Sequence, residues 1–169
     1  MITKKVILIG DFATGKTSLI RRYVDNQFSD DYLTTIGVKI SKKHVQISQE
    51  LELQLMIWDI EGRTDLKETN PAYVLGAHGV IIVGDSTRQS SIDNIPLHLK
   101  LAQKLLKNVP AVVALNKADL LTEDVQMKSI VSQLHDSLEG VEEIFETSAK
   151  DGRNVEELFL ALSKVILKQ

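Results

Sequence analysis

The segment from Gly10 to Thr17 limits the folds open to this chain more than any other. Its sequence, GDFATGKT, fits the pattern G-x-x-x-x-G-K-[ST] and lies between an apolar run at 6–9 and an apolar-periodic segment at 18–24. That setting predicts a buried strand, a loop and then a helix. In such a loop, backbone N–H groups and the helix N-terminus attract phosphate, and Lys16 adds a full positive charge. We therefore predict a phosphate-binding loop (P-loop, residues 10–17) rather than a glycine turn that only caps a helix.

This loop predicts contacts to a nucleotide and to a metal. We expect Lys16 to lie between the β- and γ-phosphates and the Thr17 hydroxyl to bind Mg²⁺. The residues expected around the phosphates are Gly10, Asp11, Phe12, Ala13, Thr14, Gly15, Lys16, Thr17 and Ser18.

Further along the chain, apolar runs at 79–83 and 110–115 suit buried parallel strands. Residues 37–59 alternate instead, around a turn-like segment at 47–50, which predicts a hairpin at one sheet edge. Its apolar face would carry Leu51, Leu53, Leu55 and Ile57. Strands that alternate with helices predict an α/β fold with a mostly parallel sheet, helices on both faces and a ligand site at the carboxyl ends of the strands.

Two helices are predicted in the second half of the chain. The last segment has apolar residues at helical spacing from Val155 to Ile166, behind Asn154 as N-cap and Glu157 as its capping-box partner. Another helix is expected from about Ser91 to Lys107, kinked near its start where Pro96 removes a hydrogen bond.

Composition excludes several classes of function. The chain has 169 residues and a net charge of −3, which gives no basic surface of the kind that nucleic acid requires. It has no cysteine, so disulfides, thiolate zinc sites, prenylation and palmitoylation are excluded within it. Ile2 excludes myristoylation, and no apolar run is long enough for a signal peptide or membrane span. We expect one domain over 1–169, a cytoplasmic monomer without its own membrane anchor, and any membrane association through partners.

The segment 116–119, NKAD, directly follows the strand ending at Leu115 and resembles the N-K-x-D pattern of guanine-specific nucleotide-binding proteins. A carboxylate at Asp119 can accept hydrogen bonds from guanine N1–H and its exocyclic amine, whereas adenine would leave it unpaired. Alone, four such residues also fit a polar turn. Together with the P-loop they predict GTP or GDP as the ligand.

The whole chain resembles the Rab branch of the Ras superfamily, through 35–38 (TIGV), 57–59 (IWD) and 76–83 (GAHGVIIV). The resemblance implies a three-layer P-loop G domain with a six-stranded sheet that has one antiparallel edge strand. It also implies that Asn116 braces the P-loop and the base, and that the stem of Lys117 covers the ring. A second base-binding loop is implied at 147–150, with contacts from Ser148, Ala149 and Lys150. Phe28 is implied to face the guanine edge, although core packing would also explain an aromatic residue there.

The resemblance further implies two nucleotide-sensing switches, at 34–38 and 58–62. Thr35 would bind Mg²⁺ and the γ-phosphate, Asp59 would reach the metal through water, and the N–H of Gly62 would contact the γ-phosphate. Effectors and regulators are expected to bind through residues 28–40 and 59–76. The residues expected to take part in hydrolysis are Lys16, Thr35, Glu61, Gly62 and Arg63.

Two positions depart from the family pattern. Arg63 stands where the family has the glutamine that orients the attacking water, and a guanidinium can only donate. Phe12 stands where the family has a small residue. We predict slow GTP hydrolysis; the alternatives are that Arg63 neutralises charge while Glu61 positions water, or that both are solvated.

Two rival functions stay open. One is an interaction module that is constitutively GTP-bound, with negligible GTPase activity. The other is a P-loop phosphotransferase, which would need lid segments and acceptor-binding arginines; the basic residues form no lid-like cluster.

Overall fold

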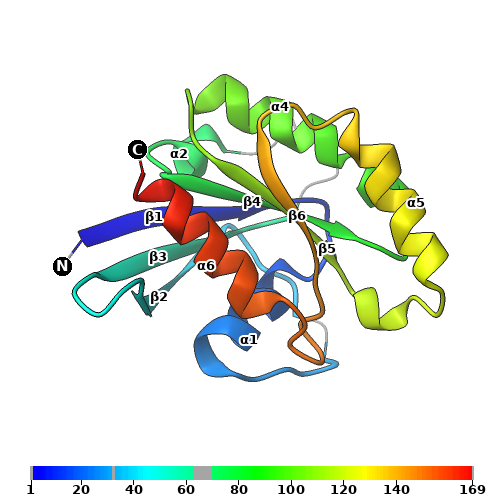
Figure 1. The fold of residues 1–169 in the computed structure, drawn as a ribbon, viewed down its shortest axis with the longest axis horizontal. Coiled ribbons are helices and arrows are strands. Elements are labelled where there is room, and N and C mark those ends of the chain that lie inside the picture. Colours follow the sequence, from blue (N-terminus) through cyan, green and yellow to red (C-terminus); the bar gives the residue numbers. More distant parts are fainter. Residues whose placement is uncertain (1, 32, 63–69, 169) are drawn as a thin grey trace.

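A twisted six-stranded sheet forms the centre of the molecule in the computed structural model, which describes residues 2–31, 33–62 and 70–168 (Figure 1). The strand order is β2-β3-β1-β4-β5-β6. All neighbours are parallel except β2, which pairs antiparallel with β3 at one edge. The strands are β1 (Ile2–Ile9), β2 (Val38–Gln46), β3 (Glu52–Ile60), β4 (Gly79–Asp85), β5 (Ala111–Asn116) and β6 (Val141–Glu146).

Helices cover both faces of this sheet. They are α1 (Lys16–Asp25), α2 (Pro71–Val74), α3 (Gln89–Asp93), α4 (Ile95–Leu105), α5 (Asp124–His135) and α6 (Val155–Ile166). Val6 and Leu8 of β1 belong to the core under α1 and α6, whereas Ile7 and Ile9 belong to the core under α2 to α5. Alternate residues of a strand point to opposite faces, so one apolar run fills both cores. The predicted three-layer α/β fold is confirmed.

The hairpin of β2 and β3 forms where alternation predicted it. Leu53, Leu55 and Ile57 are fully buried on one face, and the N–H of Ile47 donates to the carbonyl of Leu51 at 2.9 Å in the turn. Leu51 itself was expected on the buried face but lies in the turn before β3 and is only partly buried.

The predicted helix over 91–107 is confirmed only as α4, and its predicted start was wrong, because α3 and α4 are separate helices that meet at Asn94. Pro96 lies in the first turn of α4, where no intrahelical partner is needed for the missing N–H. The proline therefore begins a new helix instead of kinking an existing one.

The predicted capping box of α6 was also wrong. Asn154 precedes the helix with φ +53°, in the left-handed region, and makes no side-chain cap. Its Nδ2 donates instead to the carbonyl of Glu146 at 2.8 Å, so the side chain ties the start of α6 to β6.

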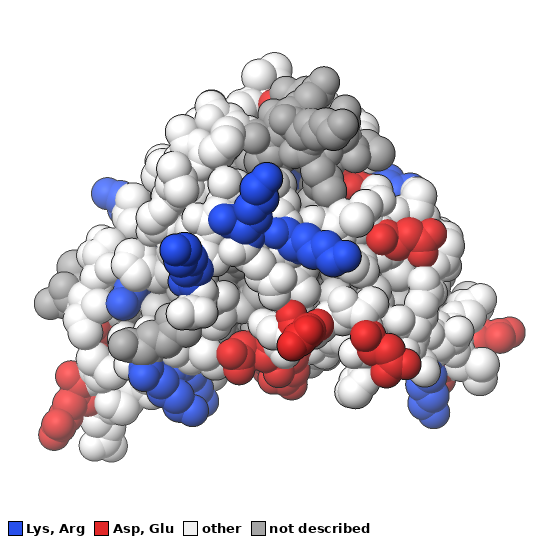
Figure 2. All heavy atoms as spheres, turned by 90° about the horizontal axis from the view of Figure 1, so that it is seen from above, with Lys and Arg blue, Asp and Glu red and all other residues white. Residues whose placement is uncertain are grey.

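The surface carries both signs of charge. Seen from above, Lys and Arg side chains gather near the middle of the face, and Asp and Glu side chains lie mostly toward its lower margin (Figure 2). Within residues 2–31, 33–62 and 70–168, no helix is long and apolar enough to cross a membrane.

Candidate nucleotide-binding site

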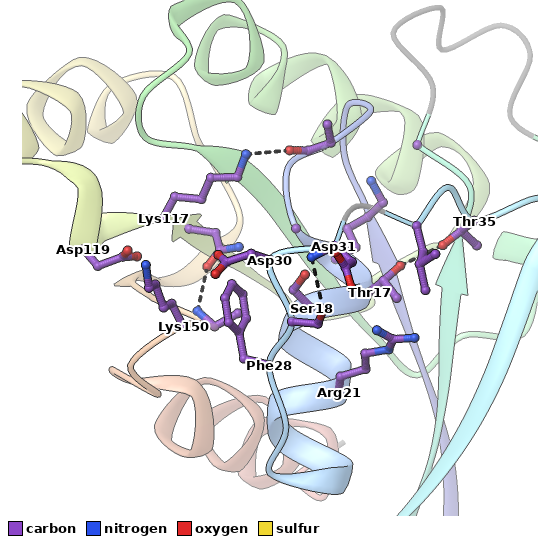
Figure 3. A pocket seen from close by; sticks show the side chains of 18 of the residues that line it. Thr17, Ser18, Arg21, Phe28, Asp30, Asp31, Thr35, Lys117, Asp119 and Lys150 are labelled. Carbon is purple, nitrogen blue, oxygen red and sulfur yellow. Dashed lines mark hydrogen bonds between the residues drawn. The ribbon is translucent and has the colours of Figure 1, made fainter.

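A cavity of about 310 Å³ opens at the carboxyl ends of the parallel strands. Its walls come from segments far apart in the sequence (Figure 3). Lys117, Asp119, Lys150 and Phe28 gather at one end, and Thr17 and Thr35 lie at the other. This is the edge at which parallel α/β sheets bind ligands.

Most of the predicted site residues line this cavity. They are Phe12, Ala13, Gly15, Lys16, Thr17, Ser18, Phe28, Thr35, Gly62, Asn116, Lys117, Asp119, Ala149 and Lys150. Of the other predicted residues that the structure describes, those outside the lining are Gly10, Asp11, Thr14, Asp59, Glu61 and Ser148. Arg63 lies outside the described residues. The lining also includes Arg21, Ser29, Asp30, Asp31, Leu33 and Leu120, which we had not predicted. Arg21 lies four residues after Thr17, on the same face of α1, and this spacing could have suggested that it lines the cavity.

The P-loop packs too closely for side chains at its two glycines. A Cβ on Gly10, where φ is +153°, would lie 2.2 Å from the carbonyl oxygen of Val83. A Cβ on Gly15, where φ is +97°, would lie 2.2 Å from Nδ2 of Asn116. The motif therefore specifies glycine by both conformation and space.

Lys16 is held inside the P-loop, with only 6% of its surface exposed. Its Nζ donates to the carbonyls of Gly10 at 3.0 Å and Asp11 at 2.8 Å. Burial lowers the pKa of Lys16 to about 8, and the carboxylates of Asp59 and Asp11 oppose that shift. The ammonium group is thus fixed next to the cavity and available to an anion.

Asn116 joins the P-loop to the loop at 147–150. Its Nδ2 donates to the carbonyl of Thr14 at 3.0 Å, and its Oδ1 accepts from the N–H of Ala149 at 3.3 Å. Ser148 donates from its hydroxyl to Asp119 Oδ1 at 2.7 Å. The motifs after β1, β5 and β6 therefore form one hydrogen-bonded unit.

Two supporting residues were missed in the sequence. Asp85 ends β4 and its Oδ2 lies 2.6 Å from Nζ of Lys117, which also donates to the carbonyl of Ala13 at 2.9 Å. Burial would raise the pKa of Asp85, but hydrogen bonds from Lys117 and Thr87 outweigh it and lower that pKa. Asp85 is an acidic residue at the end of β4, and β4 lies next to β5, the strand that precedes Lys117. That position could have suggested the pair.

Arg22 is the second missed residue. It donates from Nε to the carbonyl of Ala149 at 2.7 Å and from Nη2 to that of Lys150 at 2.6 Å. No local pattern pairs α1 with a loop this distant in the chain.

Three oxygen ligands converge next to Lys16. The Thr17 hydroxyl lies 2.7 Å from that of Thr35 and 2.5 Å from Asp59 Oδ2, and Thr35 donates to the same carboxylate oxygen at 3.2 Å. Asp59 Oδ1 is buried and has no hydrogen-bond partner among the described residues. Burial raises the pKa of Asp59. Hydroxyl and carboxylate oxygens are the ligands that Mg²⁺ prefers, so this set fits that ion.

The two switch segments contact each other. The N–H of Glu61 donates to the carbonyl of Gly37 at 2.9 Å, and the N–H of Gly37 donates to Glu61 Oε2 at 3.2 Å. Gly62 packs on the P-loop, where a Cβ would lie 2.8 Å from Lys16 Nζ and from the Cα of Phe12. Phe12 is 45% exposed at the cavity wall.

Phe28 fits both of the hypotheses raised for it. It packs against the core formed under α1 and α6, and its side chain also lines the end of the cavity that holds Lys117, Asp119 and Lys150.

The family model for the Ras family matches residues 5–168. The chain belongs to the Ras family. It is 34% identical over 163 residues to the GTP-binding protein ypt1 of Schizosaccharomyces pombe, covering 96% of this chain and 79% of that protein. It is 35% identical over 164 residues to the GTP-binding protein yptV2 of Volvox carteri, covering 96% of this chain and 75% of that protein. This Ras-family chain is therefore a Rab-like small GTPase with a P-loop.

Proposed function

We propose that this Rab-like GTPase is a switch that binds GTP and GDP with Mg²⁺ in the cavity, signals through its two switch segments and hydrolyses GTP slowly. The observation that carries the proposal is the position of Asn116. It bonds to the P-loop at Thr14 and to the base loop at Ala149, so the phosphate and base ends form one site.

Each group of residues has a role in this proposal. Residues 13–18 hold the phosphates, with Lys16 between the β- and γ-phosphates. Asp119, oriented by the Ser148 hydroxyl, accepts from guanine, and the stem of Lys117 covers the base. The face of Phe28 packs at the edge of the base.

Thr17, Thr35 and Asp59 would hold Mg²⁺. When bound, the ion would supply positive charge that offsets the negative charge of the phosphates during hydrolysis. The unpartnered Oδ1 of Asp59 supports a ligand at that position, either direct or through water.

Slow hydrolysis follows from the residues around the γ-phosphate. The guanidinium of Arg63 has no acceptor atom with which to orient a water. One carboxylate oxygen of Glu61 accepts from Gly37, which favours a role in joining the switches over a role in positioning water. The exposed ring of Phe12 narrows access for a group inserted from a partner protein.

Effector binding through residues 28–40 and 59–76 is supported by apolar exposure there. Ile36 is 85% exposed, and about half of the surface of Leu33, Ile40 and Leu75 is exposed. Exposed apolar side chains mark a protein-binding surface where they form one contiguous patch, which this proposal requires of them. That the chain is one domain, a monomer and a cytoplasmic protein stays a prediction.

The proposal is tested by the nucleotide that the purified protein carries. We expect mass spectrometry to find GTP or GDP, and timed chromatography of the same sample to find slow conversion of GTP to GDP. Exclusive binding of ATP would contradict guanine recognition by Asp119.

A constitutively GTP-bound interaction module is the second candidate, favoured by Phe12 and Arg63. It predicts that the sample keeps its GTP throughout and that its affinity for a partner does not change when GDP is loaded.

A further inference from the structure

Asp11 is buried within the P-loop, and its side chain contacts other residues of the protein and does not line the cavity. Two residues of the α3–α4 segment make hydrogen bonds with its carboxylate. His98 Nε2 lies 2.8 Å from Oδ1, and Asn94 Nδ2 donates to Oδ2 at 2.8 Å. Asp11 and His98 are each only 3% exposed. Both oxygens of this carboxylate are therefore occupied by protein donors.

The charge on Asp11 determines which ring nitrogen of His98 carries a hydrogen in this contact. Burial would raise the pKa of Asp11, but the hydrogen bonds from His98 and Asn94 outweigh it and hold that pKa below its usual value. An ionised carboxylate only accepts, so Nε2 of His98 carries the proton that is shared with Oδ1. A third contact runs from the same segment, since Arg88 Nη2 donates to the carbonyl of Phe12 at 2.5 Å.

The backbone of Asp11 connects this contact to the phosphate end of the site. Its carbonyl accepts from Lys16 Nζ at 2.8 Å and from the Thr14 hydroxyl at 3.1 Å. One residue therefore bonds to α4 through its carboxylate and to the phosphate-binding ammonium through its carbonyl.

We propose that His98 is a positioning residue for nucleotide binding: through Asp11 it holds the P-loop in the arrangement that presents Lys16 to the phosphates, and so sets how long the nucleotide stays bound. The inference rests on the proposed function, because it concerns retention of the same nucleotide. Removing the His98 donor leaves Asp11 Oδ1 buried and without that partner, which destabilises the carboxylate in its present position. The P-loop is the part that moves, since its other side is the cavity.

The test compares His98→Phe, which keeps a ring but removes the donor, with His98→Gln, which keeps a donor. Leu99→Val is the matched control, because Leu99 is equally buried on α4 and has no hydrogen bond to the P-loop. We expect His98→Phe to release fluorescent GDP about tenfold faster than the wild type, the effect of one charged hydrogen bond. His98→Gln restores most of the retention, and Leu99→Val behaves as the wild type does.

A second measurement separates positioning from general loosening. GMP lacks the β-phosphate that Lys16 would contact, so His98→Phe should weaken competition by GDP more than competition by GMP. Asp11→Ala combined with His98→Phe should release GDP no faster than Asp11→Ala alone, because His98 acts through Asp11.

The inference fails if His98→Phe retains GDP as well as Leu99→Val does. It also fails if His98→Phe weakens competition by GDP and by GMP equally, or if the effects of Asp11→Ala and His98→Phe on the rate of GDP release add. Should His98→Phe not fold, Asn94→Ala decides in its place: faster GDP release supports the inference, and wild-type release overturns it. A wild-type protein that holds no guanine nucleotide contradicts the proposed function, whereas normal retention by both His98→Phe and the wild type contradicts this inference alone.

Discussion

The end of the cavity proposed to hold the base and the end proposed to hold the γ-phosphate are built in different ways. At the proposed base end, Asn116 ends β5, Lys117 follows it and Ser148 lies just after β6, and all three make side-chain hydrogen bonds to other loops. At the γ-phosphate end, Gly62 contributes backbone and Phe12 an exposed ring. Strand ends fix the first set in place, whereas the second set belongs to loops. Binding and hydrolysis should therefore respond separately to mutation.

Lys16 is the residue proposed to bind the phosphates of both GDP and GTP, so replacing it should have the largest effect. Lys16→Met keeps an apolar stem of similar length in a buried position but removes the ammonium group. We expect GDP affinity to fall roughly a thousandfold, the equivalent of two charge-assisted hydrogen bonds. Fluorescence titration with labelled GDP measures it. Lys128→Met, on the exposed side of α5, is the control, and tight GDP binding by Lys16→Met would contradict the assigned role.

Asn116→Ala should cause the next largest loss, and it acts on the base end. It leaves the buried carbonyl of Thr14 and the N–H of Ala149 without their partner. We expect GDP release to accelerate about a hundredfold and the free energy of unfolding to fall by about 1–3 kcal/mol. Stopped-flow release and denaturant unfolding measure the two effects. As a control, Gln103→Ala removes an exposed amide and should change neither the rate of GDP release nor the free energy of unfolding. If Asn116→Ala released GDP at the wild-type rate, the link that Asn116 makes between the two loops would not be needed for nucleotide binding.

Metal removal tests the cluster of Thr17, Thr35 and Asp59, at the end of the cavity opposite Lys117 and Asp119. In Asp59→Asn the amide oxygen can still accept from Thr17 and Thr35, while an NH₂ group takes the position of the unpartnered Oδ1. We expect EDTA to accelerate GDP release about tenfold in the wild type and to have little effect in this variant. Asp124→Asn, on the exposed side of α5, should respond as the wild type does. Equal responses of wild type and Asp59→Asn would exclude Asp59 from the metal site.

The difference between residues placed by strand ends and residues placed by loops also explains which parts of the site could be predicted from the sequence. The P-loop and 116–119 each follow an apolar strand directly, so their position at the sheet edge could be predicted from order alone. The contact of Arg22 with the base loop depends on elements distant in the chain, which no local pattern relates. Pro96 was misread because the pattern of apolar residues continues across the break at Asn94.

Arg63→Gln should give a change no larger than that of metal removal, and we expect it to affect hydrolysis and not nucleotide binding. Glutamine can both donate and accept, so it can hold a water against the γ-phosphate, which an arginine cannot do. We expect single-turnover GTP hydrolysis, followed by phosphate release, to rise about tenfold, less than a fully positioned catalytic group contributes. GDP affinity should stay unchanged, because the contacts of Asn116 and Asp119 are untouched.

The other outcomes of this substitution separate the remaining hypotheses. A fall in rate would make Arg63 a catalytic arginine, and Arg63→Lys should then retain part of the activity because it keeps the charge. An unchanged rate would make Arg63 a solvated residue and would transfer the question to Phe12, where Phe12→Gly opens the cavity wall. A change in GDP affinity as large as the change in rate would contradict the separation of the two ends, since residues at the γ-phosphate end would then also determine nucleotide binding.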